Sequence, residues 1–227
     1  MTEFSGRRVV VVGASGALGD GLAAAFLQAG ASVAGVDRAV PDGPRRRPGV
    51  DYHALDVLDD AALGAWFDAA LAPWAVVNTV GGFAGASPLT ELDVAELNAQ
   101  LQLNLVSAAL LTKHALRRMA GIGAGRVVHT ASRAALVTEG TGFAYSVSKL
   151  AVLHLVEMAA RETHGSAITV NAVVPSIMDT PANRRAMPDA PHEQWPKVAD
   201  VAAVYVFLAS PAAHLVSGAA VPVYGRS

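Results

Sequence analysis

Short runs of apolar, mostly β-branched residues alternate along this chain with longer segments whose apolar residues recur at helical spacing. Strands that are apolar on both faces are typical of a parallel sheet covered on both sides, and strands that alternate with helices form βαβ units. The pattern predicts strands at residues 8–12, 32–36, 50–55, 75–80, 126–130, 168–174 and 219–223. It predicts helices from the first glycine-rich segment to residue 29 and at residues 59–70, 93–119, 143–163 and 198–209.

Right-handed crossovers between such units give a doubly wound α/β fold. We therefore expect a Rossmann-type parallel sheet of about seven strands with helices on both faces. Its ligand site should lie at the carboxyl ends of the strands. The chain has 227 residues, of which 52% are hydrophobic, and this predicts one catalytic domain over residues 1–227.

The composition argues against several kinds of site. No cysteine is present, which excludes disulfides, thiolate metal sites and cysteine nucleophiles. The seven histidines have no metal-ligand spacing, so we expect no catalytic metal. The net charge of −2 gives no general attraction for nucleic acid or an anionic membrane, and no apolar run has the length of a span. We expect a soluble, cytoplasmic protein without nucleic-acid or membrane partners.

The first predicted strand runs into a glycine-rich loop, GASGALG, and then into a helix. Glycines let the backbone turn tightly and approach a pyrophosphate, and the helix N-terminus offers free N–H groups and a positive dipole end. The loop therefore predicts a dinucleotide site. Its expected contacts are Gly13, Ser15, Gly16, Ala17, Leu18 and Gly19.

Asp37 ends the second predicted strand, 24 residues after Gly13. A carboxylate at about this spacing meets the adenosine ribose, where it accepts hydrogen bonds from the 2′-hydroxyl and repels a 2′-phosphate. We expect NAD as the cofactor, and the neighbouring Arg38 leaves NADP open.

Polar or small residues also follow the third and fourth predicted strands. Asp56, with Val57, would either meet the adenine or cap the next helix. Asn78 ends the fourth apolar run, and Gly81 would let the backbone pack against the cofactor.

Tyr145 and Lys149 are four residues apart in a predicted helix, so both project from one face. A nearby ammonium stabilises phenolate and lowers the pKa of a tyrosine, which makes the phenol a proton donor or acceptor. Ser132 follows a predicted strand, and its hydroxyl would polarise a substrate carbonyl or hold an alkoxide.

These features occur in a familiar order, together with Asn104 and the segment Asn-Ala-Val-Val-Pro at residues 171–175. The chain resembles the short-chain dehydrogenase/reductase family over essentially its whole length. The resemblance implies an NAD(P)-dependent enzyme that transfers hydride between the cofactor and a carbonyl or alcohol small molecule. It also implies a homodimer or homotetramer, in agreement with the broad apolar stripes of residues 93–119 and 143–163.

The resemblance further assigns roles to individual residues. Tyr145 would exchange the proton, Ser132 would orient the substrate, and Lys149 would lower the pKa of Tyr145 and bind the nicotinamide ribose. Asn104 would hold a water that relays protons through Lys149. Further cofactor contacts are implied for Pro175, Ile177 and Thr180.

Two alternatives stay open. The loop spacing G-x-x-G-x-x-G, the segment 81–85 and the segment 179–188 resemble the dihydropteridine reductase branch, which reduces a quinonoid pterin. That branch typically lacks the serine, so Ser132 favours ketone or alcohol chemistry. A non-catalytic dinucleotide-binding sensor or scaffold is the alternative of another class, and it has no need of Ser132, Tyr145 and Lys149 together.

A long segment at residues 175–197 contains five prolines and follows the carboxyl end of a predicted strand. Long loops at such places are often functional, so we interpret this one as a lid over the substrate. Residues expected to line the substrate pocket are Phe83, Arg133, Phe143, Met178 and Trp195.

Overall fold

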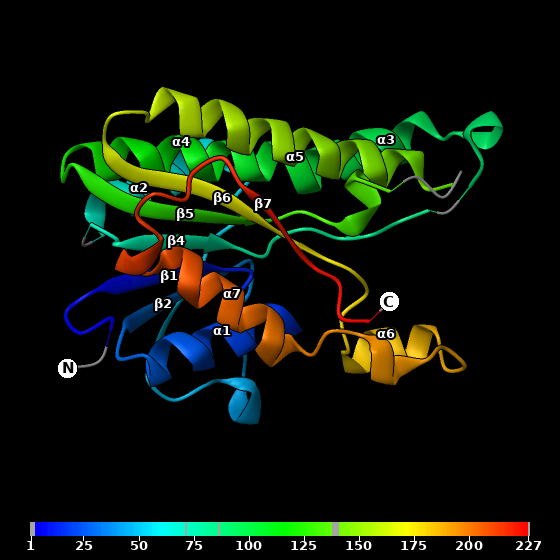
Figure 1. Ribbon diagram of the computed structural model, residues 1–227, viewed down its shortest axis with the longest axis horizontal. Coiled ribbons are helices and arrows are strands. Elements are labelled where there is room, and N and C mark those ends of the chain that lie inside the picture. The colour runs from blue at the N-terminus through cyan, green and yellow to red at the C-terminus, as the bar shows by residue number, and fades with distance from the viewer. Residues whose placement is uncertain (1–2, 71, 86, 138–140, 227) are drawn as a thin grey trace.

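A seven-stranded sheet forms the centre of the protein, with the strand order β3-β2-β1-β4-β5-β6-β7 and parallel pairing throughout (Figure 1). The computed structural model describes residues 3–70, 72–85, 87–137 and 141–226. The strands are β1 (Arg8–Val12), β2 (Ser32–Asp37), β3 (Val50–Ala54), β4 (Ala75–Asn78), β5 (Ala124–Thr130), β6 (Ala167–Pro175) and β7 (Ala220–Val223).

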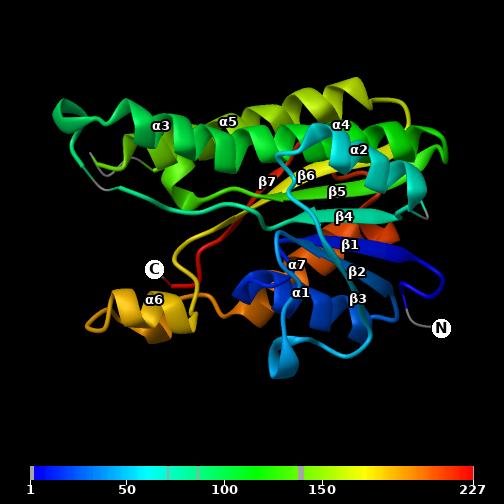
Figure 2. The ribbon, with the colours of Figure 1, turned by 180° about the vertical axis from the view of Figure 1, so that it is seen from behind.

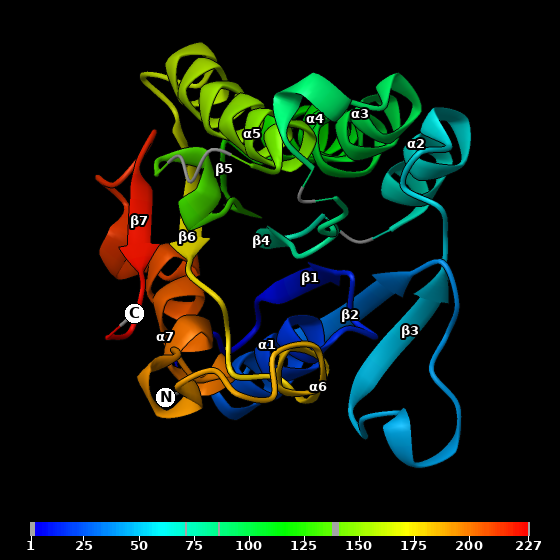
Figure 3. The same ribbon diagram turned by 90° about the vertical axis from the view of Figure 1, so that its right-hand side faces the viewer.

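Helices cover both faces of the sheet. α1 (Ala17–Gln28) and α7 (Val198–Ala209) pack on one face, and α2 (Asp60–Ala69), α4 (Ser107–Ala120) and α5 (Phe143–Glu162) pack on the other. Figures 2 and 3 show these two layers above and below the sheet. This arrangement confirms the predicted doubly wound α/β fold.

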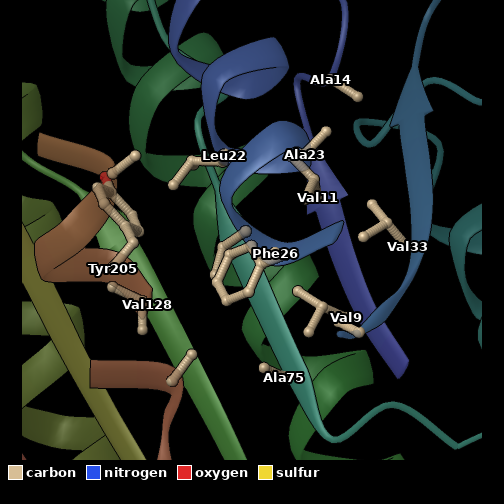
Figure 4. Close-up of a cluster of buried hydrophobic side chains, with 14 of the residues drawn as sticks. Val9, Val11, Ala14, Leu22, Ala23, Phe26, Val33, Ala75, Val128 and Tyr205 are labelled. Carbon is tan, nitrogen blue, oxygen red and sulfur yellow. The ribbon is translucent and has the colours of Figure 1, made fainter. Parts of the chain in front are cut away.

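The inner strands β1, β4, β5 and β6 are buried on both faces, as their continuous apolar runs predict, whereas the edge strands β3 and β7 are partly exposed. Val9 and Val11 contact the α1–α7 layer, whereas Val10 and Val12 contact the opposite layer. Phe26 of α1 fills the space between β1 and α7 with no exposed surface (Figure 4). The sheet is therefore a rigid support for the loops at its carboxyl edge.

The strand order reverses between β1 and β4. The chain moves outward from β1 to β3 and then returns to place β4 on the other side of β1. The loops after β1 and β4 therefore leave in opposite directions, which opens a crevice at the carboxyl ends of these two strands. This crevice is where sequence analysis expects the ligand.

The predicted helix over residues 93–119 is interrupted in the structure. α3 (Val94–Gln100) passes into a π-helical turn, Leu101–Val106, before α4 begins. Apolar periodicity does not reveal an i to i+5 turn, because such a turn keeps apolar residues on roughly the same face. Turns of this kind are frequent at functional sites.

The expectation of an irregular loop over residues 175–197 needs a correction, because a short helix, α6 (Pro181–Ala186), forms there. Thr180 is its N-cap and accepts a hydrogen bond from the Asn183 backbone N–H at 3.2 Å, with Pro181 in the first helical turn. A Thr-Pro pair is a helix-start signal, but the surrounding prolines concealed it.

In the described part of the chain, α5 is the one helix with the length and hydropathy of a membrane span. Its buried side chains, Val152, Val156 and Ala159 among them, lie against the sheet. A helix on the core of an α/β domain passes the same test of length and composition.

Candidate active site

The loop between β1 and α1 packs closely on its neighbours. Gly13 has a φ of +83°, which glycine adopts without strain, and a Cβ there would clash with the Thr79 hydroxyl. A Cβ on Gly19 would clash with the Gly13 carbonyl oxygen, so α1 approaches the loop only because residue 19 has no side chain. Steric packing thus explains why glycine is present at both of these predicted positions.

The start of α1 fits a pyrophosphate. Gly16 is the N-cap and provides no side chain for the N–H groups of the first turn. These groups lie at the carboxyl edge of β1, at the positive end of the helix dipole. Asp20 brings a negative charge to this turn, but Arg47 binds its carboxylate through two hydrogen bonds of 2.8 and 2.6 Å. The ion pair offsets that charge and occupies Arg47.

Asp37 lies directly beside the loop. One carboxylate oxygen accepts a hydrogen bond from the Ser15 backbone N–H at 3.0 Å, and the other accepts one from the Arg38 N–H at 2.8 Å. Asp56 accepts one from the Leu58 N–H at 3.0 Å, whereas Asp59 is the N-cap of α2. The alternative of Asp56 as the helix cap is therefore wrong.

A cavity of about 220 Å³ opens at the crevice between the β1 and β4 loops. Seven of the predicted cofactor residues line it: Gly13, Gly16, Asp37, Arg38, Asp56, Val57 and Gly81. The other residues that line this cavity were not predicted from the sequence; they are Val12, Leu55, Leu58, Thr79, Val80, Leu103 and Ser107. Most of them adjoin predicted residues along the chain. Leu103 and Ser107 come from the π turn and α4, so only the tertiary structure could identify them.

Tyr145, Lys149 and Ser132 lie at the carboxyl edge of the sheet. The first two are one turn apart on α5, and Ser132 comes directly after β5. The Ser132 hydroxyl is hydrogen-bonded to the Tyr145 phenol. Its oxygen also accepts a hydrogen bond from the Ala134 N–H at 3.2 Å, which fixes the serine at the start of a 3₁₀ turn.

The Lys149 ammonium is buried and donates a hydrogen bond to the Thr130 carbonyl oxygen at 2.9 Å. Gly81 lies against it, since a Cβ on Gly81 would be 2.7 Å from Lys149 Nζ and 2.6 Å from Asn104 Oδ1. Asn104, in the π turn, accepts a hydrogen bond from the Gly82 N–H at 3.1 Å. The π turn thus joins the loop after β4 to the catalytic end of α5.

Burial changes the acidity of Tyr145 and Lys149. It raises the pKa of Tyr145 above its ordinary value, and the hydrogen bond from Ser132 acts in the opposite direction. Burial lowers the pKa of Lys149 to about 8. The expectation that Lys149 lowers the pKa of Tyr145 is not met in this structure, because its ammonium is turned to the Thr130 carbonyl group.

A directional chain of hydrogen bonds, which sequence analysis did not anticipate, supports the loop after β4. The Val80 N–H donates to Asn78 Oδ1 at 3.0 Å, and Asn78 Nδ2 donates to His129 Nδ1 at 3.2 Å. His129 Nε2 then carries the proton and donates to Thr112 Oγ1 at 2.8 Å, which donates to the Ala108 carbonyl oxygen at 2.7 Å. Burial lowers the pKa of His129 to about 4, so the histidine is neutral near pH 7.

The expected substrate residues divide into two groups. Phe83 is 65% exposed and meets the Tyr145 ring edge-on at 5.2 Å, and Phe143 is exposed in the first turn of α5. Trp195 is only 6% exposed and lies 4.6 Å from the His192 ring. Met178 packs against the α1–α7 core layer. These contacts give no support to the prediction that Trp195 and Met178 line the pocket, because Trp195 is buried and Met178 packs against the core.

The segment after β6 carries the remaining predicted cofactor residues. Pro175 ends β6 and is buried, and Ile177 is exposed. Thr180 is buried as the cap of α6. These residues lie at and just beyond the carboxyl end of β6, where a cofactor contact was expected. Among the described residues no group of His, Asp and Glu side chains has the arrangement of a metal site.

A glycine loop, an acid after the second strand and a Ser–Tyr–Lys set along one sheet edge define an oxidoreductase of the short-chain type. The chain belongs to the short-chain dehydrogenase/reductase family, because the family model described as enoyl-(acyl carrier protein) reductase matches residues 13–225. It is an enzyme of this type, and the class of chemistry is dehydrogenation or reduction at alcohol and carbonyl groups.

Individual relatives cover nearly the whole chain. The cis-4-hydroxycyclohexanecarboxylate dehydrogenase of Sinomonas cyclohexanicum is 34% identical, over 98% of this chain and 96% of its own. The D-threitol dehydrogenase of Mycolicibacterium smegmatis is 29% identical, over 98% of this chain and 93% of its own length. A solved structure of a short-chain type dehydrogenase/reductase from Mycobacterium ulcerans has a TM-score of 0.90 at 28% identity, over 99% of this chain and 90% of its own.

The buried ammonium should cost stability at neutral pH. The pKa of Lys149 is about 8 in the folded protein, below the ordinary value of about 10.4, so the unfolded chain binds more protons between these pH values. We predict that Lys149→Met stabilises the protein at pH 7 by an amount on the order of 3 kcal/mol. The gain should shrink as the pH rises from about 8 to about 10.4.

Urea unfolding across this pH range measures the difference. Lys197→Met is the matched control, because Lys197 is exposed at the start of α7 and its replacement should give no such trend. A stability difference for Lys149→Met that does not depend on pH would contradict the assignment of a buried, charged lysine.

Proposed function

We propose that this chain transfers hydride between a bound nicotinamide cofactor and a secondary alcohol or ketone, with Tyr145 as the proton donor and acceptor. The observation that carries the proposal is the hydrogen bond between Ser132 and Tyr145, on the same sheet edge as the glycine loop and beside the buried Lys149. The relatives named above are dehydrogenases of alcohols, and they favour neither pterin reduction nor a non-catalytic sensor.

The cofactor fits the residues that are present. Gly13, Gly16 and Asp37 line the cavity, and the first-turn N–H groups of α1 have no side-chain cap and would bind a pyrophosphate. The Asp37 carboxylate, held beside the loop, would accept a hydrogen bond from a ribose hydroxyl. We assign the inner end of the site to Asn78, Gly81 and the segment after β6. When bound, the nicotinamide ring supplies or accepts the hydride.

Each catalytic side chain then has one task. Tyr145 gives its phenolic proton to the carbonyl oxygen during reduction and takes it back during oxidation. Without substrate, the Ser132 hydrogen bond lowers the pKa of the Tyr145 phenol. With substrate bound, the single hydroxyl hydrogen of Ser132 would be donated to the carbonyl oxygen instead. Lys149 would bind the nicotinamide ribose, and Asn104 would hold a water that connects Lys149 to solvent.

We predict that Tyr145→Phe lowers kcat/KM by about 10²–10⁴-fold, because general acid–base catalysis typically contributes that much. Binding of NADH should be unchanged. Absorbance of NADH with a panel of ketones measures turnover, and NADH fluorescence measures binding. Tyr52→Phe, in the edge strand β3, is the control. A Tyr145→Phe variant that keeps wild-type rates would overturn the proposal.

Replacing the serine tests the acidity of the phenol. The Ser132 hydrogen bond lowers the pKa of Tyr145. In Ser132→Ala, the increase of the alcohol oxidation rate with pH should therefore occur at higher pH than in the wild-type protein.

We propose NAD as the preferred cofactor, because the Asp37 carboxylate is held beside the loop by two backbone N–H groups and would repel a 2′-phosphate. Asp37→Asn should raise kcat/KM for NADPH by about ten-fold, since it removes a full charge next to Arg38. Asp42→Asn, at an exposed loop position, should leave the preference unchanged. An NADPH preference in the wild-type protein would refute the assignment.

We propose that residues 175–197 close over the substrate. The segment is fastened at its base, where the Asp179 N–H donates to the Pro196 carbonyl oxygen at 2.9 Å and the Arg226 N–H donates to the Gln194 carbonyl oxygen at 2.9 Å. α6 lies between these points at the carboxyl edge of the sheet (Figure 3). Cofactor and substrate together should slow trypsin cleavage after Arg184 and Arg185, and an unchanged rate would argue against a lid.

We also propose a homodimer or homotetramer in the cytoplasm. Leu136 and Leu150 are about half exposed, and both line a groove of about 230 Å³ between α5 and β7. Met158 is exposed further along α5. Apolar surface of this kind is often covered by a second subunit. Sedimentation equilibrium measures the assembly, and a monomer at micromolar concentration would refute it.

A further inference from the structure

Arg133 follows Ser132 and begins the 3₁₀ turn that Ser132 caps. The hydrogen bond from the Ala134 N–H to Ser132 Oγ fixes this turn, so the start of the Arg133 side chain is fixed as well. The arginine therefore adjoins the group that hydrogen-bonds the Tyr145 phenol.

The far end of Arg133 also stays at the carboxyl edge of the sheet. Its guanidinium carbon lies 5.6 Å from the centre of the Tyr224 ring. The Tyr224 carbonyl oxygen accepts a hydrogen bond from Ser176 Oγ at 2.8 Å, and the Ser176 N–H donates to the Val223 carbonyl oxygen at 3.3 Å. The guanidinium thus bridges the end of β5 and the ends of β6 and β7.

The charge of Arg133 has no acidic partner within the described ranges, where the ion-paired arginines are Arg8, Arg47 and Arg184. Arg133 is half-buried, so part of its hydration is lost. A guanidinium stacked on an aromatic ring keeps its N–H fork free to bind a carboxylate in a bidentate manner. The arrangement is one that an anionic ligand would complete.

The surroundings of Tyr145 are apolar on another side. Phe83 is largely exposed and presents its ring edge-on to Tyr145, and Phe143 is exposed in the same part of α5. A hydrocarbon skeleton would bury apolar surface against these rings. The carboxyl edge of the sheet therefore carries an unpaired cation over the Tyr224 ring and exposed aromatic surface beside the phenol.

We infer that this enzyme takes hydroxy acids and keto acids with a compact hydrocarbon skeleton, whose carboxylate binds Arg133 while the skeleton packs against Phe83. The inference rests on the proposed function and names its substrate class. Arg133 is then a specificity-determining residue, and it should contribute to binding even where no hydride is transferred.

Binding without turnover tests this most sharply. Cyclohexanecarboxylate and cyclohexanecarboxamide, which lack the reacting hydroxyl group, are titrated calorimetrically into the full chain with and without NADH. The wild-type protein should bind the carboxylate at least about ten-fold more tightly than the amide, since a hydrogen bond to a charged group is typically worth that much. Arg133→Gln should remove the difference, and Arg133→Lys should restore part of it.

Arg117→Gln is the matched control, because Arg117 is exposed on α4 and its loss should leave the ten-fold difference intact. Equal binding of the two ligands by the wild-type protein would overturn the inference, and so would an undiminished difference in Arg133→Gln. Failure of the proposed function has a different signature, in which no alcohol is oxidised and Tyr145→Phe behaves as the wild type.

In a second assay, cis-4-hydroxycyclohexanecarboxylate and its methyl ester are compared as substrates with NAD. Arg133→Gln should lower kcat/KM for the acid by about ten-fold or more and leave that for the ester within about two-fold. An equal loss for both substrates would mean that Arg133 only supports the position of Ser132, and this result would also overturn the inference.

Discussion

The hydrogen bond from the buried Lys149 ammonium to the Thr130 carbonyl oxygen holds the catalytic end of the protein together. It ties α5 to the end of β5, and so it fixes Tyr145 relative to Ser132. An ammonium group in such a place is costly because burial removes its hydration, as the lowered pKa of Lys149 reflects. The fold retains this charge at the carboxyl edge of the sheet, next to Gly81 and Asn104.

The space around the ammonium depends on residues that are distant in sequence. Gly81 leaves room for Lys149 Nζ, and the π turn brings the Asn104 carboxamide to the same point. The neutral His129 connects Asn78 to Thr112 on α4, and these hydrogen bonds fix the loop after β4 to that helix. Together these contacts keep the cofactor crevice and the proton-transfer group in one rigid frame.

Much of the fold follows from local sequence. Apolar runs mark every strand of the sheet within a few residues, and the Tyr–Lys spacing places both groups on one helix face. The π turn, the short helix α6 and the His129 chain were not predictable, because each depends on hydrogen bonds or caps that apolar periodicity does not encode. The direction of the pKa shift at Tyr145 was also missed, since sequence gives no measure of burial.

A crystal structure of the protein with bound NADH would show directly where the cofactor lies relative to Tyr145. We predict the pyrophosphate at Gly13–Gly19, the adenosine ribose at Asp37 and the nicotinamide ring beside the Tyr145 hydroxyl, with Lys149 in reach of the inner ribose. Electron density that places the dinucleotide elsewhere, or a Tyr145 phenol that points away from the nicotinamide ring, would contradict it.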